Sequence, residues 1–243
     1  MYKRFSDYYD LLTFDIDYER YANNIFKILE GMGIKEGNLL EIACGTGNLT
    51  ERLAKGDFEI LAFDNSVDML NKAFPKLVDL DNVTLVMQDM FDFDYSSFDY
   101  DGVICLLDVI NYIIDEGDLK EFFKKVHGGL KDGGVFIFDI KSEDKLKRVL
   151  ANNSFIYEKD NIFYTWENTM EGDLVNFYLN FFIEEENGLY TRVEESQTER
   201  YYSIEQIRLA LEKVGFKDIS FMDEDSGEDL GPRSQRILVK AVK

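Results

Sequence analysis

The stretch LLEIACGTGNLTERLA, from Leu39 to Ala54, decides how the rest of the chain is interpreted. It begins as an apolar segment, passes through Gly45 and Gly47, and continues as an amphipathic segment. Glycines at such a turn let the backbone approach a ligand closely, and the helix that follows presents unpaired N–H groups to that ligand. The stretch therefore predicts a strand, a glycine turn and a helix that together cradle a nucleotide.

The chain around this unit alternates short apolar runs with segments whose apolar residues recur at helical spacing. The apolar runs are NLLEIA, FEILAFD, VTLVMQD, DGVICLL and GGVFIFDI, and the helical segments include DYERYANNIFKILEGMG, SVDMLNKAF, DLKEFFKKVHGGL and SIEQIRLALEKVGF. Because strands buried on both faces are apolar throughout, this alternation predicts an α/β fold, a doubly wound parallel sheet with helices on both faces. We expect the core over residues 36–142, preceded by an N-terminal helical lid over residues 1–35.

The segment from about 153 to 200 breaks this rhythm. Its apolar residues alternate strictly in LVNFYLNFFI, and Asn-Gly at 187–188 and Asp-Asn at 160–161 are typical of tight turns. The segment predicts antiparallel strands joined by hairpins, inserted after the fifth core strand as a cap over a site. Residues 201–243 restore a helix and two closing strands, so we expect a single domain.

The two faces of the central strand of this insertion differ. One face is purely apolar, and the other carries Asn176, Tyr178, Asn180 and Phe182. The mixed face suits the wall of a pocket, and the alternative is ordinary sheet packing or a dimer interface.

The composition indicates a globular protein with a strongly acidic surface. In 243 residues, 48 Asp and Glu outnumber 27 Lys and Arg, which gives a net charge of −21. Such a surface repels phosphate backbones and argues against a nucleic-acid partner, whereas it suits solubility or a cationic or amine substrate. The sequence has no apolar run long enough to span a membrane, no signal-peptide pattern and only two cysteines, so we expect a cytoplasmic protein without disulfides or a zinc site.

Polar residues follow the predicted strands, at the edge where open α/β sheets bind their ligands. Asp64 ends the second strand, 17 residues beyond Gly47, and suits hydrogen bonds to two ribose hydroxyls, or else caps the next helix. Gln88 and Asp89 end the third strand and offer an amide and a carboxylate to an adenine amine. A dinucleotide fold would require a third glycine or alanine where this chain has Thr50, which weakens that alternative.

These motifs, E-x-x-C-G-T-G followed by F-D-x-S-x-x-M-L and then Q-D, resemble the class I S-adenosylmethionine-dependent methyltransferases. The resemblance covers the chain from Leu39 to about Ile140. At both ends the chain looks like a bacterial subgroup of small-molecule methyltransferases. The resemblance implies a Rossmann-like sheet of seven strands whose last strand is antiparallel to the others, and S-adenosyl-L-methionine as cofactor.

The resemblance also implies roles for single residues. Gly45 and Gly47 would lie against the methionine part of the cofactor, and Asp64 against its ribose. Glu41 would orient the glycine turn or reach the ligand through water, and Tyr9 would approach the cofactor carboxylate. The other cofactor-binding residues that we expect flank the adenine or complete the pocket, namely Ala43, Asn65, Met69, Gln88, Asp89, Met90 and Leu107.

The methyl acceptor is expected to meet the segment after the fourth strand, LLDVINY. There Asp108, Asn111 and Tyr112 are the candidate catalytic residues, because a carboxylate and a phenol could hold an ammonium group and accept its proton. The alternative is that Asp108 and Asn111 only fix the loop. Arg236, near the end of the chain, is expected to form a surface ion pair or to bind an anionic substrate group. No residues have the spacing of metal ligands, so no metal is expected.

We therefore expect a methyltransferase that acts on a small molecule by direct in-line transfer in a dehydrated pocket. An amine is slightly favoured over a hydroxyl as the acceptor, because an amine only needs to be neutral when it attacks. The alternatives are methylation of tRNA or protein, and a catalytically silent cofactor-binding regulator. An insertion of exposed strands could also form a homodimer.

Overall fold

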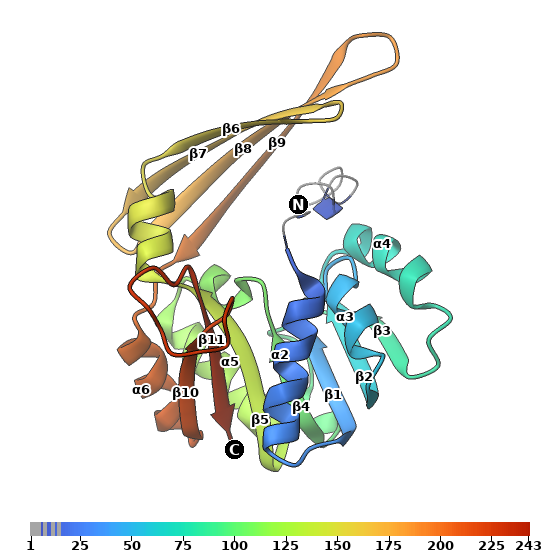
Figure 1. Cartoon of the computed structure of the whole chain (residues 1–243), viewed down its shortest axis with the longest axis vertical. Coiled ribbons are helices and arrows are strands. Elements are labelled where there is room, and N and C mark those ends of the chain that lie inside the picture. Colours follow the sequence, from blue (N-terminus) through green and yellow to red (C-terminus); the bar gives the residue numbers. More distant parts are fainter. Residues whose placement is uncertain (1–5, 7–8, 11–12, 14–15) are drawn as a thin grey trace.

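The core of the molecule is one mixed sheet. The computed structural model describes residues 6, 9, 10, 13 and 16–243. Its core strands are β1 (Glu36–Ile42), β2 (Asp57–Asp64), β3 (Val83–Met87), β4 (Tyr100–Cys105), β5 (Leu130–Lys141), β10 (Lys217–Asp223) and β11 (Arg236–Val242). The strand order is β10-β11-β5-β4-β1-β2-β3 (Figure 1), with β1 to β5 parallel and β11 antiparallel to both neighbours. The predicted seven-stranded sheet with an antiparallel last strand is confirmed.

Helices cover both faces of this sheet, as predicted. α2 (Tyr18–Gly31), α3 (Asn48–Leu53) and α4 (Val67–Leu77) pack on one face, and α5 (Glu116–Gly129) and α6 (Ile204–Val214) pack on the other. The helices α2, α4, α5 and α6 each follow an Asp or Ser whose side chain accepts a hydrogen bond from a backbone N–H of the first turn. Such caps satisfy donors that a helix leaves unpaired, and they explain why these helices start where they do.

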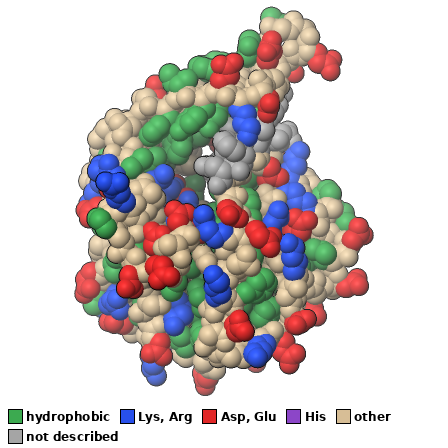
Figure 2. All heavy atoms as spheres, in the orientation of Figure 1, with side chains coloured by type: hydrophobic (Ala, Val, Ile, Leu, Met, Phe, Trp, Pro, Cys, Tyr) green, Lys and Arg blue, Asp and Glu red, His purple; other side chains and the backbone are tan. Residues whose placement is uncertain are grey.

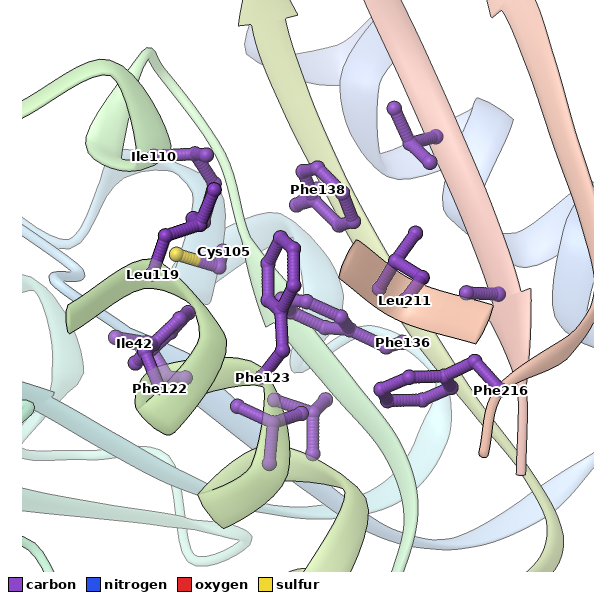
Figure 3. Packing of buried hydrophobic residues seen from close by; sticks show 14 of the residues in the cluster. Ile42, Cys105, Ile110, Leu119, Phe122, Phe123, Phe136, Phe138, Leu211 and Phe216 are labelled. Carbon is purple, nitrogen blue, oxygen red and sulfur yellow. The ribbon is translucent and has the colours of Figure 1, made fainter. Parts of the chain in front are cut away.

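Aromatic side chains fill the space between the sheet and α5 (Figure 3). Phe122 and Phe123 of α5 pack against Phe136 of β5, with ring centroids 6.2 Å and 6.0 Å apart. Phe216, which follows α6, lies 6.0 Å from the same ring. Burying a side chain of this size contributes about 1.5–3 kcal/mol. This aromatic layer therefore stabilises the packing of α5 and α6 on the sheet.

A second sheet is inserted between β5 and α6. The π-helical segment η3 (Asp144–Leu150) leads into β6 (Ser154–Lys159), β7 (Ile162–Glu171), β8 (Leu174–Glu184) and β9 (Tyr190–Arg200), which pair antiparallel in that order. The predicted turns join β6 to β7 and β8 to β9, with positive φ angles at Asp160 and Gly188. We call β6 to β9 the cap sheet, and Figure 1 shows it leaning over the end of the core where β1 to β5 finish.

The apolar face of the cap sheet is the face turned toward the core. Val175 and Phe177 of β8 are fully buried and pack with Leu146 and Leu150 of η3. On the opposite face Tyr178 is 46% exposed. We call the face that carries Val175 and Phe177 the inner face, and Figure 2 shows hydrophobic side chains gathered there above the hollow between cap sheet and core. The mixed face, proposed from the sequence as a pocket wall, therefore points outward.

Part of the N-terminal lid predicted over residues 1–35 lies outside the described residues. The described remainder includes α2, which packs on the core through Tyr21, Ala22, Ile25 and Leu29. No helix in the described part of the chain has the length and apolarity that crossing a bilayer requires.

Candidate active site

The site lies where the strand order reverses, between β1 and β4. A cavity of about 420 Å³ opens at the carboxyl ends of these strands. Its described walls come from the segments that end or follow β1 to β4, from Tyr9 and Tyr18 in the N-terminal region, and from Gln197 of β9. A cavity of this size is typical of small-molecule sites.

The turn after β1 is held by its own backbone. Ala43, Gly45 and Gly47 have positive φ angles. The N–H of Gly45 donates to Oδ2 of Asp64 at 2.9 Å, and the N–H of Gly47 donates to the carbonyl of Cys44 at 3.0 Å. A Cβ on Gly47 would lie 3.0 Å from side chains of α4, so this position requires glycine for packing as well as for backbone conformation. Gly47 therefore packs against α4 and supports the turn without lining the cavity.

Asp64 joins the turns that follow β1 and β2. Its carboxylate accepts the N–H of Gly45 at 2.9 Å and the N–H of Ser66 at 2.8 Å, and its side chain lines the cavity while being only 8% exposed. Burial raises the pKa of Asp64, and the backbone N–H groups of Ser66 and Gly45 oppose this rise. The cap of α4 is Ser66, whose hydroxyl accepts the N–H of Met69, so Asp64 is not the residue that caps this helix.

The segments after β2 and β3 meet at the rim of the cavity. Asn65 Nδ2 donates to Asp89 Oδ2 at 3.4 Å, and Asp89 Oδ1 accepts the N–H of Phe91 at 2.8 Å. Met69 is buried beside them, with a side chain 5% exposed that lines the cavity. The residues expected around an adenine are thus brought together.

The N-terminal region reaches the glycine turn through Asp10. Thr46 Oγ1 donates to Asp10 Oδ1 at 2.6 Å, and Lys76 Nζ of α4 donates to Asp10 Oδ2 at 2.7 Å. Burial raises the pKa of Asp10, but its contacts with Lys76, Thr46 and Asn48 outweigh burial and hold that pKa below its usual value. The neighbouring Tyr9 lines the cavity.

Glu41 is a buried acid in the same wall. Its side chain is 3% exposed, and its Oε2 has no hydrogen-bond partner within the described part of the chain. Burial raises the pKa of Glu41 to about 8; the Thr50 hydroxyl opposes this rise and the Asp64 carboxylate adds to it. Because this pKa lies above 7, Glu41 is mostly a neutral carboxyl at pH 7.

Burial also raises the pKa of the neighbouring Cys44 thiol, which argues against Cys44 as a nucleophile.

The candidate catalytic residues after β4 lie in different places, and among them only Tyr112 is a described lining residue of the cavity. Tyr112 lines the cavity, and its hydroxyl donates to Gln197 Oε1 at 2.9 Å. Asn111 is fully buried; its Nδ2 donates to the carbonyl of Arg200 at 2.8 Å and its Oδ1 accepts the N–H of Lys141 at 2.9 Å. Asn111 thus ties the end of β9 to the end of β5 and does not line the cavity. Its geometry matches the loop-fixing alternative.

Asp108 belongs to a group that we call the ion cluster, formed by Asp108, Asp139, Lys141, Glu199 and Arg236, in which Asp139, Lys141 and Glu199 are buried and Asp108 and Arg236 are partly exposed. Arg236 contacts Asp108 through both Nη atoms and lies 2.8 Å from Asp139. Lys141 Nζ lies 2.9 Å from Asp108 and 2.7 Å from Glu199 of the cap sheet. Burial raises the pKa of Asp108, but the charges of Arg236 and Lys141 outweigh it, so that pKa lies below its usual value. Asp108 is outside the described cavity lining.

Two expectations from the sequence change as a result. The carboxylate of Asp108 is already engaged by two cations, so the geometry gives it no free position toward a methyl acceptor. Arg236, whose side chain is 21% exposed, forms a partly buried ion pair with Asp108 and Asp139, whereas a surface pair or an anion site was expected.

Nearly all of the predicted cofactor-binding residues line the cavity. Those that do are Tyr9, Glu41, Ala43, Gly45, Asp64, Asn65, Met69, Gln88, Asp89, Met90 and Leu107. Gly47 is the exception. Among the lining residues that were not predicted, Tyr18 and Gln197 come from outside the segments that end or follow β1 to β4. Gln197 pairs in register with Phe177, and it is this pairing that places Gln197 on the inner face of the cap sheet.

Comparison with known proteins agrees with this geometry. A family model described as a methyltransferase domain matches residues 39–134. The crystal structure of an S-adenosylmethionine-dependent methyltransferase from Clostridium acetobutylicum ATCC 824 is 37% identical, covers 99% of this chain and 98% of that chain, and has a TM-score of 0.89. The protein YqeM of Bacillus subtilis (strain 168), which carries a methyltransferase name, is 28% identical over 100% of this chain and 97% of the relative.

A more distant structure shares the fold alone. The sugar N-methyltransferase KedS8 from Streptoalloteichus sp ATCC 53650 is 21% identical with a TM-score of 0.79, over 97% of this chain and 92% of that chain. The full-length match at 37% identity carries the assignment, and the family model covers the strand ends that form the cavity. The chain therefore belongs to the S-adenosylmethionine-dependent methyltransferases, with S-adenosyl-L-methionine as its methyl donor.

Proposed function

We propose that this chain transfers the methyl group to a small-molecule amine. The observation that carries this proposal is the charge of the cavity. The carboxyl side chains among its described lining residues are Glu41, Asp64 and Asp89, and those lining residues include no lysine, arginine or histidine. Acidic walls attract cations and repel anions, which favours a sulfonium donor and an amine acceptor over an anionic acceptor. The net charge of the whole chain, −21, is also negative.

The residues at the cavity fit the donor. The glycine turn leaves room for the methionine part beside Gly45, and Asp64 is held toward the cavity by two backbone N–H groups, in position for ribose hydroxyls. The unpartnered Oε2 of Glu41 leaves an acceptor free for a polar group. We assign Tyr9 to the methionine carboxylate and the rim formed by Asn65 and Asp89 to the adenine.

The acceptor side of the cavity is formed by Tyr112 and Gln197, because they join the core to the cap sheet at the cavity. When bound, S-adenosyl-L-methionine supplies an electrophilic methyl group, so the chain mainly has to align an acceptor and exclude water. Alignment alone can contribute about 7–11 kcal/mol to lowering a barrier. A phenol and an amide orient an acceptor through hydrogen bonds, and a neutral amine then attacks without a dedicated base.

Two structures with the same fold carry titles that name them as N-methyltransferases. KedS8 is titled a sugar N-methyltransferase and MtfA a glycopeptide N-methyltransferase, at 21% and 19% identity. Their likeness to this chain is one of fold, and it supports an amine acceptor only in showing that the fold accommodates one. A homodimer through the antiparallel insertion, which is the cap sheet, stays a prediction.

The proposed reaction class is tested with an acceptor panel. We expect S-adenosylhomocysteine to be released with small amines, including amino sugars, and not with carboxylates, because the cavity wall is acidic. The measurement is mass spectrometry of both products for amines, phenols, carboxylates, a tRNA pool and a protein lysate, each with labelled donor. Label on tRNA or protein without any small-molecule product would overturn the proposal. Cofactor binding without turnover on any acceptor would favour the regulator alternative.

The acceptor side is tested by Gln197→Leu. The substitution keeps the volume of the side chain and removes the amide that meets Tyr112. We expect the KM of the acceptor to rise roughly 2-fold to 12-fold, as for the loss of a typical hydrogen bond worth about 0.5–1.5 kcal/mol, with unchanged affinity for the donor. Steady-state kinetics with the acceptor found in the panel, combined with calorimetry of the donor, separates the two effects.

The matched control is Tyr178→Phe, which removes a hydroxyl from the outward face of the same sheet. We expect it to leave the acceptor KM unchanged, because Tyr178 is 46% exposed and does not line the cavity. If Tyr178→Phe raised the acceptor KM and Gln197→Leu did not, the acceptor would approach the other face of the cap sheet.

A further inference from the structure

Glu41 has an unusual environment for an acid in a cation-binding cavity. It lies on β1, the central strand at the reversal of strand order, and pairs with Ala62 of β2 and Ile104 of β4. Its side chain is 3% exposed and it lines the cavity, yet it forms no ion pair with any described residue and its Oε2 has no hydrogen-bond partner there. A buried carboxyl in this position is held in its neutral form.

The groups around Glu41 reinforce that neutral form. Asp64 at the end of β2, Cys105 on β4 and Cys44 after β1 are the described titratable groups that interact with its carboxyl. All of them are acids, and the remaining neighbour, Thr50 of α3, is an uncharged hydroxyl. Among the described residues the carboxyl therefore has no compensating cation, and a positive charge that enters the cavity would supply one.

We propose that Glu41 releases its proton to solvent when the positively charged donor enters the cavity, so that the protein recognises the sulfonium charge itself. This inference rests on the proposed placement of the donor at the strand ends. The donor and its demethylated product share the amino, carboxylate and nucleoside groups and differ by one methyl group and one positive charge. An ionised Glu41 attracts the positive sulfonium of the donor more strongly than the neutral thioether of the product. The cavity thereby binds S-adenosyl-L-methionine in preference to S-adenosylhomocysteine.

The pH dependence has a definite sign. In the free protein the pKa of Glu41 is about 8, so at pH 7 the carboxyl is mostly protonated. A bound cation stabilises the ionised form and lowers that pKa, which means that binding at pH 7 releases a proton. The affinity for the donor relative to the product therefore rises with pH between the pKa of Glu41 in the donor complex and its higher pKa in the product complex, and levels off above the latter. The amino group common to both ligands largely cancels in this ratio.

The experiment is isothermal titration calorimetry of the full chain in buffers with different ionisation enthalpies. For S-adenosyl-L-methionine at pH 7 we expect release of about 0.5–1 proton, and distinctly less for S-adenosylhomocysteine. The ratio of the two affinities should rise roughly tenfold between about pH 6 and about pH 8. Equal proton release for both ligands in the wild-type protein would overturn the inference, whether or not any variant folds.

Two variants assign the effect to this residue. Glu41→Gln replaces the carboxyl with a neutral group of the same shape, and we expect the proton release and the pH dependence of the affinity ratio to disappear. Asp92→Asn removes an exposed acid that does not line the cavity, and should keep both. If Glu41→Gln released as many protons as the wild type, the inference would fail while the proposed function stood. If neither ligand bound the wild-type protein, the placement of the donor would itself be wrong.

Discussion

Replacing Asp64 with alanine is expected to weaken S-adenosyl-L-methionine binding by about 1–3 kcal/mol, roughly 5-fold to 150-fold. Two losses add up in this variant. The ribose hydroxyls lose the carboxylate that we place against them, and the N–H groups of Gly45 and Ser66 lose an acceptor that holds them at 2.9 Å and 2.8 Å. The glycine turn is then less well ordered before the ligand arrives. Calorimetric titration with the donor measures the change.

The control for this prediction is Asp92→Ala. Asp92 also follows β3 near the cavity, but it is exposed and does not line the cavity, so its removal tests the general effect of one less negative charge. We expect that variant to bind the donor as the wild type does. Asp64→Asn should fall between the two, because it keeps one oxygen as an acceptor. Unchanged affinity in Asp64→Ala would remove this residue from the site.

The side of the cavity that we assign to the cofactor was predictable because it depends on local patterns. A parallel sheet places the carboxyl ends of its strands at one edge, so residues that follow different strands meet without any knowledge of their contacts. Asp64 and Asp89 were predicted to meet on that ground, Glu41 was expected beside them from the resemblance, and all three line the cavity. The fold followed from the same alternation of apolar runs and amphipathic segments.

The acceptor side was not predictable in this way. The period-two pattern of β8 shows that its faces differ, but it does not show which face turns toward the core. That choice depends on the packing of η3 against Val175 and Phe177, and hence on tertiary contacts. Gln197 enters the cavity through its register with Phe177, which depends on the length of the hairpin between β8 and β9.

The choice between a catalytic and a loop-fixing role for Asp108 and Asn111 could not be made from the sequence, for a related reason. Both follow β4, where substrate residues are common, and a sequence does not reveal that their partners come from elsewhere in the chain. Arg236, which engages Asp108, begins β11, and Arg200, whose carbonyl accepts from Asn111, ends β9. A buried carboxylate paired with two cations is a stable arrangement only as part of that whole cluster.

Replacing Arg236 with leucine is expected to lower the free energy of unfolding by about 3–5 kcal/mol, because it leaves buried carboxylates without their cation. Asp139 is fully buried and Arg236 is its ion-pair partner at 2.8 Å, while Asp108 would retain only Lys141. Urea unfolding followed by circular dichroism measures the loss. Without Arg236 the pKa values of both carboxyls rise in the folded protein, so the deficit should shrink as the pH falls and these groups become neutral.

Arg233→Leu is the matched control, since Arg233 is three residues earlier, exposed, and outside the ion cluster. We expect it to change the free energy of unfolding by less than about 0.5 kcal/mol. Asp139→Asn in the Arg236→Leu background should recover part of the loss, because it removes one of the stranded charges. The cluster also holds Glu199 of β9 through Lys141, so amide hydrogen exchange in β9 should quicken in Arg236→Leu at concentrations where the core remains folded. An Arg236→Leu protein as stable as the wild type would mean that the two carboxyls are already neutral in the folded state, and that the cap sheet is held by its packing on η3 and by Asn111.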